Sequence, residues 1–142
     1  MKKTPFNIDS LPAPRASFSR GLELEISGHK LIFISGTASV GPKTQTMHKG
    51  NFEKQVEYTY RNIERLLASR GAKLRHVVRW TCYLRDMAYY EEFCRLRERI
   101  LRRHDIKRKD YPASTCVEAR LCREDLMVEI EAIAMVPPDD ED

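Results

Sequence analysis

The sequence predicts an α+β domain in which two helices cover one face of a mixed β-sheet. Two segments repeat apolar residues every three or four positions, as amphipathic helices do, and five others alternate with period two or form short apolar runs, as strands do. In chain order these segments read β-β-α-β-α-β-β, a mixture typical of helices packed on one side of a sheet. The 142 residues, 42% of them apolar, suffice for one domain with one small core.

The first two predicted strands form a hairpin. Residues 27–30 read as its turn, and residues 31–36, LIFISG, as a short buried strand. Residues 41–50 are polar and bounded by glycines, which indicates a loop. The strand before the turn, residues 18–26, has one side formed by Phe18, Arg20, Leu22, Leu24 and Ile26.

Both predicted helices have a recognisable buried stripe. The first spans residues 51–71, with Asn51 as its N-terminal cap and Gly71 at its end. The second spans residues 89–104. The stripes consist of Phe52, Val56, Tyr60, Ile63 and Leu67 in the first helix and of Phe93, Leu96 and Ile100 in the second.

Three further strands are predicted over residues 76–84, 114–120 and 126–136. The last one places Glu129 and Glu131 opposite its apolar side and stops at two prolines. We divide the chain into an extended leader (1–16), the folded domain (17–136) and an acidic tail (137–142).

Composition excludes several classes of protein. Cys82, Cys94, Cys116 and Cys122 lack the spacing of a zinc site, and no P-loop or GxGxxG motif is present, so we expect no metal and no cofactor. With neither a signal peptide nor a run of about 18 apolar residues, we expect a cytoplasmic protein with reduced thiols and no membrane partner. The net charge of +4 includes four negative charges at 139–142, so the remainder carries +8 and favours anionic partners.

The carboxylates and arginines each allow two interpretations. Glu129 and Glu131 belong either to a solvated sheet face or to a functional site, because buried unpaired carboxylates are costly. Arg97 lies about 40° from Phe93 on the helical wheel, so it either extends to solvent or reaches a pocket beside the sheet. Arg120, in the turn before the last strand, is either a surface residue or a carboxylate ligand.

Eight Lys or Arg residues lie between positions 95 and 109. This run is either a nucleic-acid patch or a solvated helix face followed by a charged loop. We favour the solvated face, because no aromatic residues are interleaved for stacking on bases.

Four blocks together resemble the RidA family, also called YjgF/YER057c/UK114: LIFISGTASVGPKT, NIERLLASRGAKLRHVVRWTCYLRDM, YPASTCVEARL and LMVEIEAIAMV. The resemblance covers residues 17–136. It implies a chorismate-mutase-like fold and a homotrimer with ligand clefts between subunits. It also implies hydrolysis of enamines and imines to 2-keto acids. Older family names, translation inhibitor and endoribonuclease L-PSP, imply an association with RNA.

Residue by residue, the resemblance is incomplete. Deaminating members read Pro-Ala-Arg-Ser where this chain reads PAST, so Ser114 stands in the place of the arginine that binds the substrate carboxylate. Cys94 replaces a family asparagine, and Phe18 replaces a tyrosine that lines the cleft. The positions that match the family's cleft are Ser35, followed in its block by Gly36 and Thr37, together with Cys116 and Glu129.

SFSRGLEL, ISGTASV and LCREDLMVEIEA also resemble the catalytic half of chorismatases, which hydrolyse chorismate. This second resemblance implies that Arg20 binds a ligand carboxylate and that Glu129 protonates an enol ether. A carboxyl group in a partly apolar cleft has a raised pKa and can act as such an acid.

Three functions follow. The first is a small-molecule enzyme or binder acting on an unsaturated or aromatic carboxylate, with chorismatase-like hydrolysis in an intersubunit cleft. The second is an imine or enamine deaminase whose carboxylate clamp has been rebuilt from Arg97 or Arg120. The third is a non-enzymatic protein associated with a small ligand or RNA.

Overall fold

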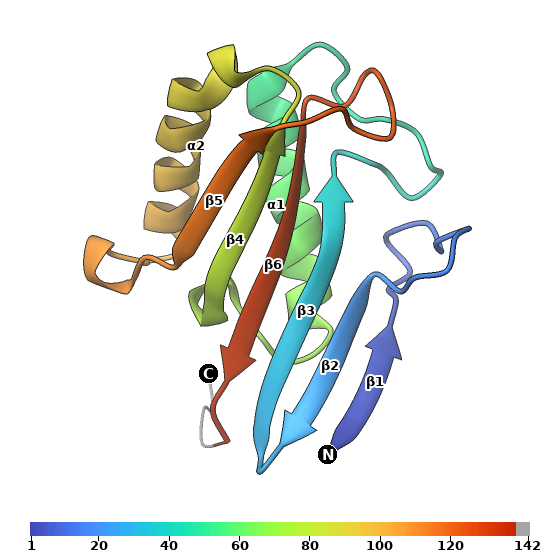
Figure 1. Ribbon diagram of the computed structural model, residues 1–142, viewed down its shortest axis with the longest axis vertical. Helices are drawn as coiled ribbons and strands as arrows, with labels where there is room; N and C mark the ends of the chain where they lie inside the picture. Colours follow the sequence, from blue (N-terminus) through green and yellow to red (C-terminus); the bar gives the residue numbers. More distant parts are fainter. Residues whose placement is uncertain (139–142) are drawn as a thin grey trace.

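The computed structural model describes residues 1–138 and contains one six-stranded mixed sheet with two helices on one face (Figure 1). The strand order is β1-β2-β3-β6-β4-β5, and only β4 and β5 pair in parallel. The strands are β1 (Lys2–Phe6), β2 (Gly21–Ile26), β3 (His29–Ala38), β4 (Val77–Leu84), β5 (Ala113–Glu118) and β6 (Val128–Val136). The helices are α1 (Phe52–Ala68) and α2 (Tyr90–Arg103), and short 3₁₀ turns span Leu74–His76, Met87–Tyr89 and Arg108–Asp110.

The predicted α+β class, both helices and all five strands are confirmed. Asn51 caps α1 as expected, because its side chain accepts a hydrogen bond from the Lys54 amide. Gly71 has a φ of 72° just beyond the end of α1. Glycine adopts this left-handed conformation without strain, whereas most other residues do not. The acidic residues of the predicted tail, 139–142, lie outside the described residues.

The strand β1 corrects the prediction of an unpatterned leader. It adds a sixth strand at the sheet edge, where Lys2 pairs with Glu25 and Phe6 with Gly21. Phe6 anchors it, since its buried ring lies over Gly21, where a Cβ would come within 2.2 Å of the ring. The segment escaped prediction because its one large apolar side chain packs against a distant glycine, and Pro5 is tolerated only because the strand is at an edge.

The helices cover the face that carries Ile32 and Ile34 of β3 and the buried residues of β6. The uncovered face carries an apolar patch in two cross-strand rows, because Leu24, Leu31 and Met135 lie side by side, as do Leu22, Phe33 and Ile133. We call these six residues the open-face patch. Phe33 is 36% exposed and Met135 is 45% exposed.

On the covered face of β2, a carboxylate takes a core position. Glu23 is only 4% exposed, and Arg70, just beyond α1, donates to both its carboxylate oxygens at 3.1 and 2.8 Å. The hydrogen bond from Arg70 holds the pKa of Glu23 below its usual value despite burial. This bidentate pair ties the end of α1 to the edge of the sheet.

We predict that Arg70→Ala destabilises the fold, because it leaves the Glu23 carboxylate buried without a partner. Breaking a buried pair costs about 3–5 kcal/mol, and we expect the lower end because Arg70 is 28% exposed. The difference from wild type should shrink as the pH falls, because protonation removes the charge of Glu23, and it should be lost only below the lowered pKa that Glu23 has beside Arg70. Urea unfolding at pH 7 and pH 4 measures both effects. Arg65→Ala, which removes an exposed arginine of α1, is the control and should change stability little.

Candidate functional site

Most of the predicted site residues fall into two separate groups within one chain. The first lines a groove of about 850 Å³ between the leader, β3 and β6, which we call the acid groove. The second lines a smaller pocket of about 220 Å³ between α2 and β5, which we call the arginine pocket. The acid groove contains Phe18, Arg20, Ser35, Gly36, Thr37 and Glu129, and the arginine pocket contains Cys94, Arg97 and Ser114.

Glu129 occupies the uncovered side of β6, beside an irregularity in β3. The pairing of β3 with β6 shifts register between Ile34 and Thr37, and the chain passes close to the glutamate there. A Cβ at Gly36 would lie 2.8 Å from Oε2 of Glu129, so the absence of a side chain at Gly36 makes room for the carboxylate. Gly36 therefore permits the position that Glu129 takes.

Two influences raise the pKa of Glu129 above its usual value. Burial is the larger and the negative charge of Glu131 is the second. Within residues 1–138 no hydrogen bond to the Glu129 carboxylate opposes them. Glu131 accepts a hydrogen bond from the Tyr83 hydroxyl, and this bond raises the pKa of Tyr83 to about 12. The result is a carboxyl group of raised pKa beside a second acidic side chain, an arrangement suited to general acid–base chemistry.

The Arg20 guanidinium donates its hydrogen bonds to the main chain and not to a carboxylate. Its Nε and Nη2 donate to the Pro12 carbonyl at 3.1 and 2.8 Å, which fastens the leader over the acid groove. The Ser35 hydroxyl donates to the Ser19 carbonyl at 2.6 Å and secures the same segment. Burial and the nearby charge of Arg123 lower the pKa of Arg20, and no acidic partner lies within salt-bridge distance in the described part of the chain.

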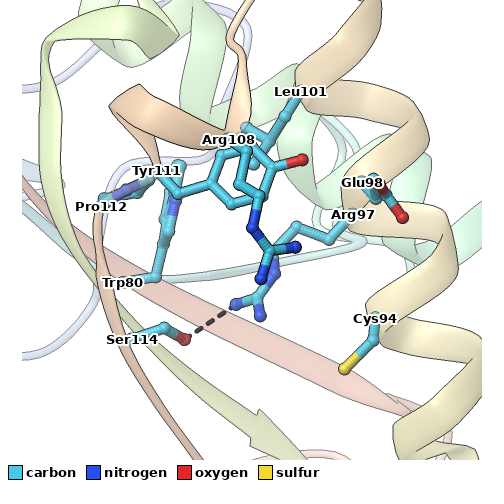
Figure 2. Close-up of a pocket in the computed structure, with 9 residues that line it drawn as sticks. All are labelled: Trp80, Cys94, Arg97, Glu98, Leu101, Arg108, Tyr111, Pro112 and Ser114. Carbon is cyan, nitrogen blue, oxygen red and sulfur yellow. Dashed lines mark hydrogen bonds between the residues drawn. The ribbon is translucent and has the colours of Figure 1, made fainter.

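The Arg97 side chain extends toward the sheet and lines a pocket beside it. It lies one turn after Phe93, with its guanidinium carbon 5.1 Å from the centre of the Phe93 ring. Its Nη1 donates to the Ser114 hydroxyl at 2.8 Å, which Figure 2 shows as the dashed line. A guanidinium from α2 therefore reaches the β5 position where the RidA pattern has its own arginine.

The cysteines near this arginine are poor nucleophiles. Burial raises the pKa of the Cys116 thiol, and it raises that of Cys82 to about 12 although Arg97 lies nearby. Both thiols are therefore protonated at neutral pH, and the nucleophile is the thiolate. Cys116 packs against the core beside Arg97 without lining either cavity.

Arg120 is not brought together with either group. It lies with Arg85, Glu118 and Met127 around another depression. Of the two arginines proposed to rebuild the clamp, Arg97 is thus the one beside Ser114.

Three of the eight basic residues at 95–109 form ion pairs along α2. Arg99 and Arg103 both contact Glu57, and Arg102 contacts Glu98 at 2.9 Å. These pairs agree with a solvated helix face.

Two residues of the site were not singled out from the sequence, Tyr83 and Arg108. Tyr83 lies opposite Glu129 because of the strand register, which is a long-range property. Arg108 was one of eight basic residues in the run at 95–109.

No group of three or more His, Cys, Asp or Glu side chains among residues 1–138 could hold a metal ion. Neither helix in that range combines the length and hydrophobicity that a membrane span requires.

The sequence model described as endoribonuclease L-PSP matches residues 9–136 of this chain. The chain belongs to this family, the RidA family. A RutC family protein of Pyrococcus horikoshii is 31% identical over 94% of this chain and 98% of its own. The 2-iminobutanoate/2-iminopropanoate deaminase of Salmonella typhimurium is 25% identical over 95% of this chain and 98% of its own. The crystal structure of the yeast protein YEO7 has a TM-score of 0.76 and 27% identity, with 94% of this chain and 98% of that chain covered. The predicted RidA-like fold is therefore confirmed.

For this RidA-family site we predict that Glu131→Gln lowers the pKa of Glu129. Removing the neighbouring charge takes away the second cause of the shift, whereas burial, the larger cause, keeps the pKa above its usual value. A ¹³C NMR titration of the glutamate carboxyl carbons measures this. Glu25→Gln, an exposed change on β2, is the control. An unaltered Glu129 titration in Glu131→Gln would contradict the proposed coupling.

Proposed function

We propose that this protein hydrolyses small 2-imino or enamine acids to 2-keto acids, with Arg97 as a rebuilt carboxylate clamp and Glu129 as the acid–base group. The observation that carries the proposal is the 2.8 Å hydrogen bond from Arg97 to Ser114. Ser114 stands where the family pattern has an arginine, and a guanidinium from α2 occupies the neighbouring space. The deaminase of Salmonella typhimurium, a relative along nearly the whole chain, supports this class of reaction.

Arg97 is suited to holding a ligand carboxylate. Its side chain donates hydrogen bonds to a neutral hydroxyl and, at 3.8 Å, to the Cys82 sulfur. No acidic side chain of residues 1–138 forms a salt bridge with it. A guanidinium without an anionic partner gains a charge-assisted, bidentate pair when a carboxylate binds.

Glu129 supplies the proton transfers that hydrolysis requires. Water adds to the C2 carbon of the imine while the imine nitrogen gains a proton. The C–N bond then breaks, ammonia leaves, and the carbonyl of the 2-keto acid forms. A carboxylate whose pKa is raised can accept the proton of water, and the carboxylic acid so formed can return it to nitrogen.

The two halves of this site face opposite sides of the sheet, so one chain does not complete it. Ser114 and Cys116 lie on the same side of β5, because side chains two residues apart in a strand share a face. Cys116 pairs with Cys82, which is buried under the helices, so Ser114 is also on the side that faces the helices. Glu129 projects from the uncovered side. We propose a homotrimer in which the β5 edge of one subunit lies against the uncovered face of the next. The open-face patch supports this arrangement, since exposed apolar patches mark interaction surfaces.

The chorismatase-like reaction, the first of the three functions, has less support. It assigned the ligand carboxylate to Arg20, whose guanidinium binds the Pro12 carbonyl instead. The relative named above for its activity is an imine deaminase. Both observations favour the second of the three functions.

We predict that Arg97→Ala lowers kcat/KM for the imine of 2-aminobutyrate about 10- to 150-fold, the effect of losing a charged hydrogen bond. Arg95→Ala, which removes an exposed arginine of the same helix, should leave the rate unchanged. The imine is generated by an amino-acid oxidase, and its decay is followed with and without the protein.

The double variant Arg97→Ala/Ser114→Arg tests whether the clamp has moved from strand to helix. Restoring an arginine at the β5 position should recover much of the lost rate. If wild type does not hydrolyse the imine, or if Arg97→Ala retains full activity, the proposed function is wrong.

We predict that light scattering gives a mass three times that of the 16.6 kDa chain. Phe33→Glu should dissociate the trimer, because it places a charge in the centre of the open-face patch. Ala68→Glu, an exposed change on α1 across the molecule, should not. A stable wild-type monomer at micromolar concentration would contradict the trimer and the shared cleft.

A further inference from the structure

The arginine pocket contains a second guanidinium that the proposed reaction has not used. Arg108 lines it from the segment between α2 and β5, where a short 3₁₀ turn spans Arg108–Asp110. Ile106, buried in the core, anchors this segment next to α2. Figure 2 shows the Arg97 and Arg108 guanidinium groups extending into the same space, one from α2 and the other from the loop.

The two positive charges lack acidic partners of their own. Over residues 1–138, neither Arg97 nor Arg108 forms a salt bridge. Glu98 also lines the pocket, but its carboxylate binds Arg102 at 2.9 Å. Two like charges that share a cavity repel each other, and a ligand with two negative charges relieves that repulsion.

The rest of the pocket limits the size and nature of the ligand. Trp80, Leu101 and Pro112 contribute apolar parts of its wall, and Tyr111 lines it together with Arg108 (Figure 2). Its volume of about 220 Å³ is below the roughly 300–1,000 Å³ typical of pockets for drug-sized ligands. A short carbon chain between two anionic ends fits this combination of walls and charges.

We propose that the arginine pocket binds a short dicarboxylate, with one carboxylate on Arg97 and the other on Arg108. The protein then prefers imines of dicarboxylic amino acids to imines with alkyl side chains. This inference rests on the proposed function, because it takes Arg97 as the clamp for the 2-imino acid carboxylate. Arg108 adds the selectivity for the side chain.

The binding experiment compares succinate with butyrate, which has the same number of carbons and one carboxylate. Calorimetry at constant ionic strength should give wild type an affinity for succinate at least tenfold higher. Arg108→Ala should remove most of that preference and leave butyrate binding unchanged. Lys109→Ala, which removes the same charge from the adjacent residue outside the pocket lining, should keep the preference. Equal affinities in wild type, or an Arg108→Ala variant that keeps the preference, would overturn the inference.

Inorganic phosphate serves as a second probe. A site that recognises two spaced carboxylates should bind phosphate much more weakly than succinate. Phosphate binding as tight as that of succinate, and equally dependent on Arg108, would mean that the pocket recognises charge alone and would overturn the dicarboxylate assignment.

The kinetic experiment separates this inference from the proposed function. We compare kcat/KM for the imine of aspartate with kcat/KM for the imine of 2-aminobutyrate. In Arg108→Ala the ratio of the first to the second should fall about tenfold or more, because kcat/KM for the imine of aspartate decreases. If Arg97→Ala reduces both rates and Arg108→Ala leaves the ratio unchanged, the proposed function stands and the dicarboxylate preference is wrong. If neither imine is hydrolysed but succinate binding still depends on Arg108, the proposed reaction is wrong and the ligand class of the pocket stands.

Discussion

The antiparallel pairing of β3 with β6 at the centre of the sheet sets the position of Glu129, Glu131 and Gly36 in the acid groove. Val128, Ile130, Ala132 and Ala134 are buried under the helices, so the alternation of a strand forces Glu129 and Glu131 onto the other face. The register shift between Ile34 and Thr37 then places Gly36 against the Glu129 carboxylate. A slip of one residue would bury both glutamates, which makes the apolar side of β6 the constraint that holds the acid in place.

The same pairing explains why the molecule has two unlike surfaces. Residues of β3 and β6 beyond the glutamates continue the alternation as Leu31, Phe33, Ile133 and Met135, which build most of the open-face patch. The acid groove and the patch are therefore neighbours on one side, while the arginine pocket lies on the other side at β5. This separation is the physical reason for proposing that subunits share a site, because a carboxylate clamp and an acid on opposite faces cannot reach one small substrate within a single chain.

The position of Arg97 illustrates how a binding group can move between elements. The family pattern has an arginine on β5, and here Ser114 leaves space that a side chain from α2 enters. The helix carries Arg97 at the border of its buried stripe, one turn from Phe93, so the aliphatic part packs and the guanidinium reaches the strand. Arg20, which a motif alone assigned to a ligand, is instead held by the Pro12 carbonyl, because the leader folds back over the groove.

By itself the sequence determined both helices with their buried stripes, five of the six strands and the faces of β6, because these depend on the local periodicity of apolar residues. It also marked Glu129, Arg97 and Ser114 as residues out of pattern. Only the tertiary structure decided that Lys2–Phe6 joins the sheet, that Arg70 neutralises Glu23, that Tyr83 binds Glu131 and that Arg108 faces Arg97. Each of these contacts joins residues from different elements, and their pairing depends on strand register and loop path, which leave no local signal in the sequence.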